Sequence, residues 1–243
     1  MAEVGGRQAG VPVEAVIFDW GGTLTPWHTV DFEREAAALA AAAVDADHTA
    51  AAALLSAGGT VWGRARDHHT SATIADIFTE AGLSHDEAML AAYREFWEPH
   101  TYTDADVVPL LSRLKVDGIK VGVLSNTVWP RAWHEDFFDR DGVLEMLDGA
   151  VYTSEIPWTK PSPEAFRAAM AAVGVDRPEH CVFVGDRLFD DVWGAKNVGM
   201  RTIHVPHSDI PLEQVGHTEG EPDAVAHRLA HVYDIVSAWR QQG

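Results

Sequence analysis

Several polar residues able to carry out nucleophilic or metal-assisted chemistry each follow a short apolar run. In chain order they are Asp19, Ser125, Lys160, Asp186 and Asp191. A carboxylate can attack an electrophilic centre or bind a hard cation, and a lysine supplies fixed positive charge. Each residue alone has a structural explanation, because carboxylates after strands are often helix N-caps and lysines before prolines are often solvated. Their shared position after successive apolar runs makes the set a candidate active site.

The apolar runs predict the elements that position these side chains. Five β-like runs, each followed by turn residues and a helical pattern, cover residues 15–18, 120–124, 150–152, 181–184 and 201–205. This alternation is typical of an α/β fold with a Rossmann-like parallel sheet and helices on both faces. Ligands of such folds bind outside the carboxyl ends of the strands, where the polar residues are expected.

The gap of about a hundred residues between the first two predicted strands is too long for one crossover connection. Its pattern is helical, and we expect an inserted helical cap domain over residues 26–104. The predicted cap helices cover residues 31–44, 49–57, 71–81 and 84–97. Residues 13–25 and 105–243 then form the core domain, after a flexible tail at 1–12. We expect a surface loop at 206–221 and a closing amphipathic helix at 222–240.

The composition disfavours some classes of binding partner. Acidic residues outnumber basic ones by 37 to 18, and the formal net charge is −19, which disfavours nucleic acid and anionic membrane surfaces as partners. The single cysteine, Cys181, opens an apolar run and is expected to be a buried thiol. No stretch is long and apolar enough to span a bilayer, so we expect a soluble, cytoplasmic protein.

Four segments, in this order, resemble the motifs of the haloacid dehalogenase superfamily of phosphatases and related hydrolases. They are Phe18-Asp19-Trp20-Gly21-Gly22-Thr23-Leu24, Leu124-Ser125-Asn126, Lys160-Pro161-Ser162-Pro163, and Gly185-Asp186 through Asp191. The resemblance extends from residue 16 to about 205. It implies the predicted fold, and the inserted helices are similar to the cap of the first subclass of the family.

The resemblance also implies a role for each motif residue. Asp19 is the expected nucleophile, which forms an aspartyl phosphate with a small phosphorylated substrate. Ser125 and Lys160 complete the catalytic set, and the expected substrate contacts come from Gly22, Ser125, Asn126 and Lys160. The expected ligands of a Mg²⁺ cofactor are Asp19, the backbone carbonyl of Gly21, Asp186 and Asp191. Asp190 competes with Asp191 for the metal, and we prefer Asp191 because its spacing from Asp186 matches the family.

Gly21 departs from the family pattern. Phosphatases of the family carry at this position an aspartate that protonates the leaving oxygen and later activates water. Its absence removes help typically worth about 10²- to 10⁴-fold, most for poor leaving groups. The substrate then needs no acid, turnover is lost, or another residue supplies the proton. His28, at the entrance to the cap, is a candidate acid, although a hinge histidine half in solvent is the more common explanation of such a residue.

Two relatives that lack this aspartate are weaker matches. Phosphonoacetaldehyde hydrolases form a Schiff base through a cap lysine, and residues 26–104 contain arginines but no lysine. Haloacid dehalogenases need no magnesium, whereas the aspartates at 186, 190 and 191 favour a retained metal. We therefore expect a magnesium-dependent phosphohydrolase acting on a phosphoric monoester or acyl phosphate. One alternative is a non-catalytic module that binds magnesium and a phosphorylated ligand, or a protein partner through its acidic surface. A dehalogenase or phosphonatase is less favoured.

Overall fold

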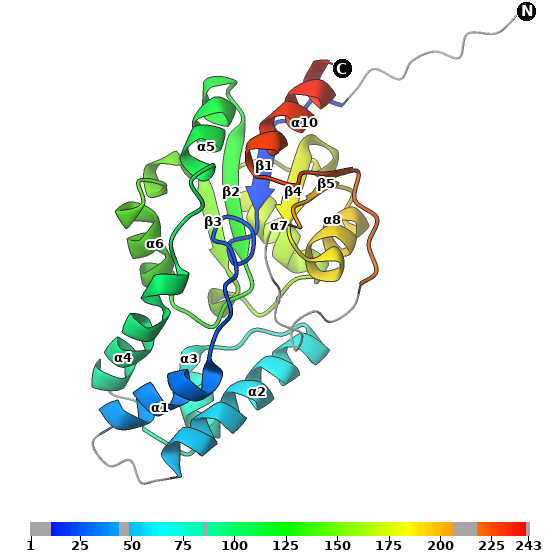
Figure 1. Ribbon diagram of the computed structural model, residues 1–243. Helices are drawn as coiled ribbons and strands as arrows, with labels where there is room; N and C mark the ends of the chain where they lie inside the picture. Colours follow the sequence, from blue (N-terminus) through cyan, green and yellow to red (C-terminus); the bar gives the residue numbers. More distant parts are fainter. Residues whose placement is uncertain (1–10, 44–48, 85–86, 207–217, 242–243) are drawn as a thin grey trace, which may run out of the picture.

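The protein is built around one parallel β-sheet (Figure 1). The computed structural model describes residues 11–43, 49–84, 87–206 and 218–241. Within these residues the strand order of the six-stranded sheet is β3-β2-β1-β4-β5-β6, and every neighbouring pair is parallel. The strands are β1 (Ala15–Phe18), β2 (Lys120–Ser125), β3 (Gly149–Tyr152), β4 (Cys181–Gly185), β5 (Arg201–His204) and β6 (Ala224–Val225).

Strand β1 lies at the centre of the sheet and shows how two cores form. Its side chains alternate between the two faces, as a strand requires. Val16 and Phe18 belong to one buried cluster, and Ala15 and Ile17 belong to the other. All four are fully buried, which is the pattern of a parallel strand covered on both sides.

Helices cover both faces of the sheet. The core helices are α5 (Val107–Val116), α6 (Arg131–Arg140), α7 (Pro163–Ala172), α8 (Gly194–Asn197) and α10 (Ala230–Gln241). Buried residues of α5, α6 and α10 join the cluster that contains Phe18, and those of α7 and α8 join the cluster that contains Ile17. Short 3₁₀ turns occupy Glu98–His100, Leu144–Met146, Thr153–Glu155 and Pro178–His180. The predicted α/β fold is therefore confirmed.

A group of helices stands between β1 and β2 in the sequence. They are α1 (Phe32–Ala42), α2 (Ala50–His68), α3 (Ile74–Glu80) and α4 (Glu87–Trp97). In Figure 1 they form a layer at the end of the sheet toward which the strand arrows point. Helix α1 packs on α2 and α4, and α2 packs on α3. These helices lie where the cap was predicted, and the limits 26 and 104 stay a prediction.

Two predictions for helices of the cap are corrected. The helix predicted over 49–57 continues to His68, because Leu54, Ala57, Val61 and Ala65 extend its buried stripe through two glycines. The helix predicted from residue 71 begins only at Ile74, after Thr73, whose N–H and hydroxyl are bound by the carboxylate of Asp76.

The predicted closing helix begins later than expected. Residues 224–225 pair with β5 as the edge strand β6, and the helix starts at Ala230 rather than at 222. The predicted tail and the predicted loop at 206–221 fall largely outside the described residues. The described parts of both, residues 11–12, 206 and 218–221, contain no helix or strand.

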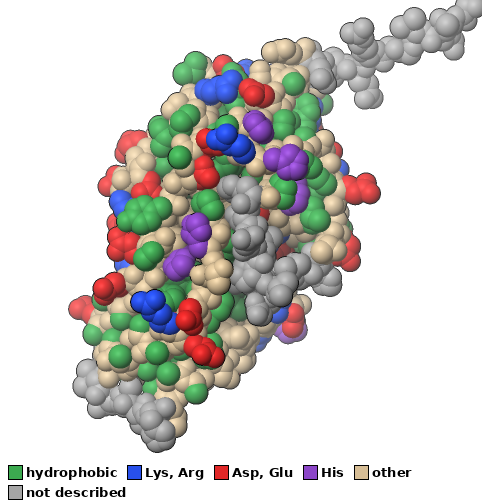
Figure 2. All heavy atoms as spheres, viewed as in Figure 1, with side chains coloured by type: hydrophobic (Ala, Val, Ile, Leu, Met, Phe, Trp, Pro, Cys, Tyr) green, Lys and Arg blue, Asp and Glu red, His purple; other side chains and the backbone are tan. Residues whose placement is uncertain are grey.

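The face of the molecule drawn in Figure 2 is mixed in charge. On the face drawn in Figure 2, basic side chains stand scattered among acidic and apolar ones, without an extended basic area among the residues shown in colour. This agrees with the net charge of −19. No helix in the described part of the chain is both long and apolar enough to cross a membrane. Cys181 is buried, as predicted.

Candidate active site

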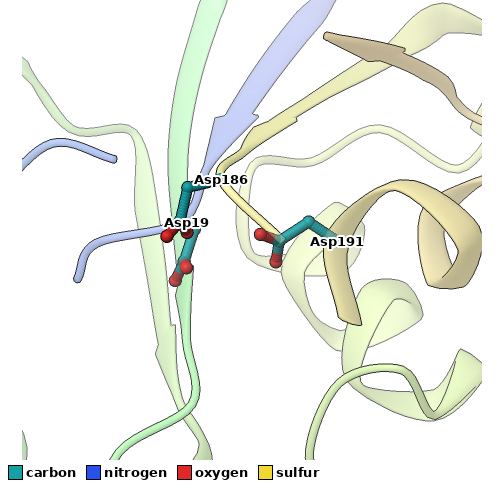
Figure 3. Close-up of side chains that lie close together, drawn as sticks. All are labelled: Asp19, Asp186 and Asp191. Atoms are coloured by element: carbon teal, nitrogen blue, oxygen red, sulfur yellow. The ribbon is translucent and has the colours of Figure 1, made fainter. Parts of the chain in front are cut away.

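Three carboxylates converge at the carboxyl end of the central strands (Figure 3). Asp19 directly follows β1, Asp186 directly follows β4, and Asp191 lies one turn further along the chain. One oxygen from each carboxylate lies within 4.8 Å of the others, and all three residues are buried. Because β1 and β4 are neighbours in register, Phe18 pairs with Val184 and the residues that follow the two strands meet.

Lys160 joins this acidic cluster. Its Nζ lies 2.8 Å from Oδ1 of Asp19 and 2.7 Å from Oδ1 of Asp191. The lysine is buried, which lowers its pKa, but the charges of Asp19 and Asp191 outweigh this effect and hold the pKa above its usual range. Lys160 is therefore a permanent cation against the predicted nucleophile.

Asp191 is positioned by an unusual turn. It lies in the π-helical turn η5 (Leu188–Trp193), which runs directly into α8. Its Oδ2 accepts a hydrogen bond from the Arg187 N–H at 2.9 Å, so the carboxylate is held from both sides. A β-carbon on Gly185 would collide with this carboxylate, which explains the glycine there. Among the described residues Asp190 is not part of the cluster, in keeping with the preference for Asp191.

Asp186 packs against the turn that follows β1. Gly22 has a φ of +90°, and a β-carbon there would overlap the Asp186 carboxylate, so the turn requires glycine. The Oδ1 of Asp186 lies 3.5 Å from the Thr23 hydroxyl, while its buried Oδ2 has no hydrogen-bond partner among the described residues.

The cluster has the donor set of a site for a hard divalent cation. Burial raises the pKa of Asp19 to about 6, against the opposing effect of Lys160, and raises the pKa of Asp186 well above its usual range. Both carboxylates are buried, and the nearby positive charges offset only part of the effect of burial. The unpartnered oxygen of Asp186 and the three converging carboxylates therefore fit a cation such as Mg²⁺.

The second predicted motif lies beside this cluster. Ser125 ends β2, is buried and lines the same cavity as Asp19. The side chain of Asn126 is used to hold the loop of Lys160: its Nδ2 donates to the Lys160 carbonyl at 3.0 Å, and its Oδ1 accepts from the Lys160 N–H at 2.8 Å. Asn126 thus positions the lysine, and its contact with substrate remains a prediction.

Trp27 takes the space beside Gly21. A β-carbon built on Gly21 would lie 3.6 Å from Cζ2 of Trp27, an ordinary contact, so alanine would fit. The position from which the aspartate is missing is therefore bordered by the indole of Trp27. The candidate acid His28 is exposed, lines the cavity, and has its ring centroid 6.4 Å from that of His100.

A cavity of about 440 Å³ opens over Asp19 and extends into the cap. Its wall is mostly apolar, and it includes Trp20 and Thr25, whose buried Nε1 and Oγ1 have no hydrogen-bond partner within the described chain. The cap side of the wall contains one carboxylate that the sequence reasoning missed, Glu35 on α1. Its spacing from the buried Leu39 is i to i+4, a signal that it shares the inward face of the helix.

Comparison with known proteins agrees with this geometry. A family model described as haloacid dehalogenase-like hydrolase matches residues 13–199. The chain therefore belongs to the haloacid dehalogenase-like hydrolases. The match includes every predicted site residue, from Asp19 to Asp191.

Individual relatives are distant. A glyceraldehyde 3-phosphate phosphatase of Methanopyrus kandleri is 29% identical over 149 residues, which cover 61% of this chain and 63% of that protein. A crystal structure of a phosphatase of the family from Thermococcus onnurineus has a TM-score of 0.62 at 23% identity, covering 92% of this chain and 98% of that one. A 2-haloacid dehalogenase from Pseudomonas syringae has a TM-score of 0.63 at 23% identity, covering 93% and 99%. Both structures have the same fold as this chain. The match spans less than two thirds of the Methanopyrus protein's length.

Proposed function

We propose that this chain is a magnesium-dependent phosphohydrolase that acts on a small phosphate ester or acyl phosphate through an aspartyl phosphate on Asp19. The observation that carries the proposal is the contact of 2.8 Å between Lys160 and Asp19 inside the buried carboxylate cluster, at the floor of the cavity. A nucleophilic carboxylate, a fixed cation and a second pair of carboxylates are the groups that phosphoryl transfer to an aspartate needs.

The first chemical step is a displacement at phosphorus. A lone pair of an Asp19 carboxylate oxygen forms the new bond to phosphorus while the bond to the ester oxygen breaks. Lys160 offsets negative charge on Asp19 and on the approaching phosphoryl group, and Ser125 is positioned to donate a hydrogen bond to a phosphoryl oxygen. Asp191 and Asn126 act by positioning Lys160.

The second step returns the enzyme to its starting state. Water attacks the aspartyl phosphate, the bond between phosphorus and the Asp19 oxygen breaks, the water passes a proton to solvent, and inorganic phosphate leaves. In the first step, with Gly21 in place of an acid, the leaving alkoxide takes its proton from solvent unless His28 supplies it. Leaving groups of low pKa are therefore favoured.

The metal is proposed from the donor set. Asp19, Asp186 and Asp191, with the carbonyl of Gly21, would hold Mg²⁺. When bound, Mg²⁺ neutralises charge on the phosphoryl oxygens and lowers the repulsion between two anions. The Oδ2 of Asp186 has no hydrogen-bond partner among the described residues, and a bound Mg²⁺ would place a positive charge next to it.

The names of relatives support the substrate class. The Methanopyrus relative is called a glyceraldehyde 3-phosphate phosphatase, so a small phosphorylated molecule is the substrate we propose, without assigning that compound to this chain. The experiment is a phosphatase panel with and without Mg²⁺, from sugar phosphates to acyl phosphates, on the wild type and Asp19→Asn. Hydrolysis that requires both the metal and Asp19 supports the proposal. Activity that survives Asp19→Asn and chelation contradicts it.

A second function is favoured by Gly21. Because no acid stands at this position and the indole of Trp27 borders it, the site could bind magnesium and a phosphorylated ligand without turnover. Metal-dependent thermal stabilisation by inorganic phosphate, with no product over hours, would support this function. Carbon–halogen cleavage is the least favoured function, and release of halide from a short 2-haloacid in the absence of metal would support it.

A further inference from the structure

The cap end of the cavity contains a carboxylate with no role in the proposed reaction. Glu35 of α1 lines the cavity, and its Oε1 accepts a hydrogen bond of 2.5 Å from Nε1 of Trp97 on α4. Tyr93, also on α4, contributes a second side-chain hydrogen bond. The Tyr93 hydroxyl itself accepts from Nε1 of Trp129 at 3.2 Å. The carboxylate is thus fixed in place by a network of aromatic residues.

The rings around Glu35 form a continuous aromatic wall, defined here as Phe32, Tyr93, Trp97 and Trp129. Trp97 lies 5.5 Å from Trp129 and 6.3 Å from Phe32, centroid to centroid, and Tyr93 stands at 89° to Trp129. All four rings line the cavity. Aromatic faces attract cations, and aromatic cages are a known way of binding quaternary ammonium groups.

Glu35 is not in an ion pair within the described part of the chain. No lysine, arginine or histidine there forms a salt bridge with it, whereas ion pairs of surface carboxylates such as Glu80 and Asp136 are present. Burial is the largest influence on this carboxyl and raises its pKa to about 7, against the opposing hydrogen bonds from Trp97 and Tyr93. A half-buried carboxylate of this kind is stabilised by a positive group supplied from outside.

One molecule can reach both Glu35 and Asp19, because both line the same cavity. A row of rings connects the two ends. Trp20, the neighbour of Asp19 in the chain, lies 5.4 Å from Trp129, and Trp129 lies 5.5 Å from Trp97, which contacts Glu35. A ligand with its phosphate at Asp19 and a second group at Glu35 therefore lies along this row.

We propose that Glu35 and the aromatic wall form a subsite for an ammonium group, so that the preferred substrates are phosphate esters whose alcohol carries a positive charge. This inference rests on the proposed function for the phosphate end of the cavity. A cation at Glu35 satisfies the carboxylate and the aromatic faces together, whereas an uncharged group leaves the carboxylate unbalanced. The net charge of −19 also favours cationic groups near the surface.

The test compares two series of alkyl phosphates with spacers of increasing length. One series ends in a trimethylammonium group and the other in the isosteric, uncharged tert-butyl group. For the wild type we expect kcat/KM to favour the ammonium member by about 10-fold or more at the best spacer length. In Glu35→Gln, which keeps the shape but removes the charge, the preference should fall to about 2-fold or less. Glu33→Gln, an exposed carboxylate on the same helix, is the matched control and should keep the preference.

Each result decides the inference. Because both series are measured on the same variant, a general loss of activity cancels in the ratio. An equal rate for the two series in the wild type, or a preference that survives in Glu35→Gln, overturns the subsite. If neither series nor p-nitrophenyl phosphate is hydrolysed, the proposed function fails and the subsite is tested by binding. Tetramethylammonium should then quench tryptophan fluorescence in the wild type and Glu33→Gln but at least about 10-fold more weakly in Glu35→Gln, and equal quenching overturns the inference.

Discussion

The ammonium of Lys160 lies 2.8 Å from the carboxylate of Asp19, and the lysine side chain is almost completely buried. It also contacts Asp191 at 2.7 Å, so one cation is shared by two buried carboxylates and offsets part of their charge. Lys160→Met should therefore lower the free energy of unfolding by about 3–5 kcal/mol at neutral pH, and should lower kcat by about 10²-fold or more. Urea unfolding and steady-state kinetics measure the two effects.

The matched control is a surface lysine with a similar contact. Lys120 lies 3.1 Å from Asp148, and its side chain is 54% exposed. Lys120→Met should cost about 1 kcal/mol or less and leave kcat near that of the wild type. Equal losses from Lys160→Met and Lys120→Met would contradict the role given to Lys160.

The contact between Trp27 and Gly21 predicts how an acid could be restored. Gly21→Ala should be tolerated, because its β-carbon would lie 3.6 Å from the indole. Gly21→Asp alone should gain less than a variant without the indole, since its β-carbon would already contact Trp27. Combined with Trp27→Ala, it should raise kcat on an alcohol phosphate such as glycerol 2-phosphate by about 10²-fold, with a smaller gain on p-nitrophenyl phosphate. No gain in the double variant would argue that the proton is already supplied.

His28 provides the complementary experiment. If no residue supplies the proton, log kcat for substituted phenyl phosphates should fall steeply as the pKa of the leaving group rises, and His28→Ala should change this slope little. A flat dependence in the wild type that becomes steep in His28→Ala would instead assign the acid to His28.

Glu35 should make stability depend on pH. Burial raises its pKa from the usual 4.5 to about 7, so the folded protein binds the proton more tightly than the unfolded chain. The contribution of Glu35 to the free energy of unfolding therefore falls as pH rises from about 4.5 to about 7 and is lowest above that range. Tyr93 and Trp97, which face the carboxylate, do not titrate in this window.

Glu35→Gln removes this titration. Relative to the wild type, the variant should become more stable as pH rises, by up to about 3 kcal/mol between pH 4 and pH 8. Urea unfolding at several pH values measures the difference, and taking it between two proteins cancels the titration of other groups. If the difference in free energy of unfolding between the two proteins does not change with pH, burial does not disfavour the ionised form of Glu35.

Mg²⁺ should stabilise the fold through the carboxylate cluster. Binding at about 100 times its Kd adds roughly 2.7 kcal/mol, seen as a rise in Tm that chelation reverses. Asp186→Asn should lose this rise, while Asp190→Asn should keep it, because Asp190 lies outside the cluster among the described residues. A shift that is lost in both variants, or in neither, would place the ion elsewhere.

The sequence was most informative about the strands and the residues that follow them. The run that ends at Phe18 is continuously apolar and bounded by a glycine turn, so both the strand and the place of Asp19 at its carboxyl end could be predicted. The burial of Asp19, which the strand pattern suggests to be exposed, could not. The length of α2 could not be predicted, because Gly58 and Gly59 are typical of a helix end. Each glycine costs about 1 kcal/mol in a helix, and the packing of Leu54 and Val61 outweighs this cost.

The parts of the site that sequence reasoning missed depend on tertiary contacts. The place of Trp27 beside Gly21 arises from the chain path into the cap, which local patterns do not encode. Glu35 belongs to the acidic first turn of α1, and only its spacing from Leu39 hints that it faces inward. The edge strand β6 is too short to leave a periodic pattern, and it exists because β5 offers a free edge.

The central claim is that Asp19 accepts the phosphoryl group. Its most direct test is mass spectrometry of the peptide that contains Asp19 after rapid mixing with acetyl phosphate and Mg²⁺ and an acid quench. We predict that this peptide gains one phosphoryl group on Asp19, at a rate that matches turnover, and that the label is absent without Mg²⁺ and in Asp19→Asn. Turnover by Asp19→Asn at the wild-type rate, or label on another residue, would contradict the account.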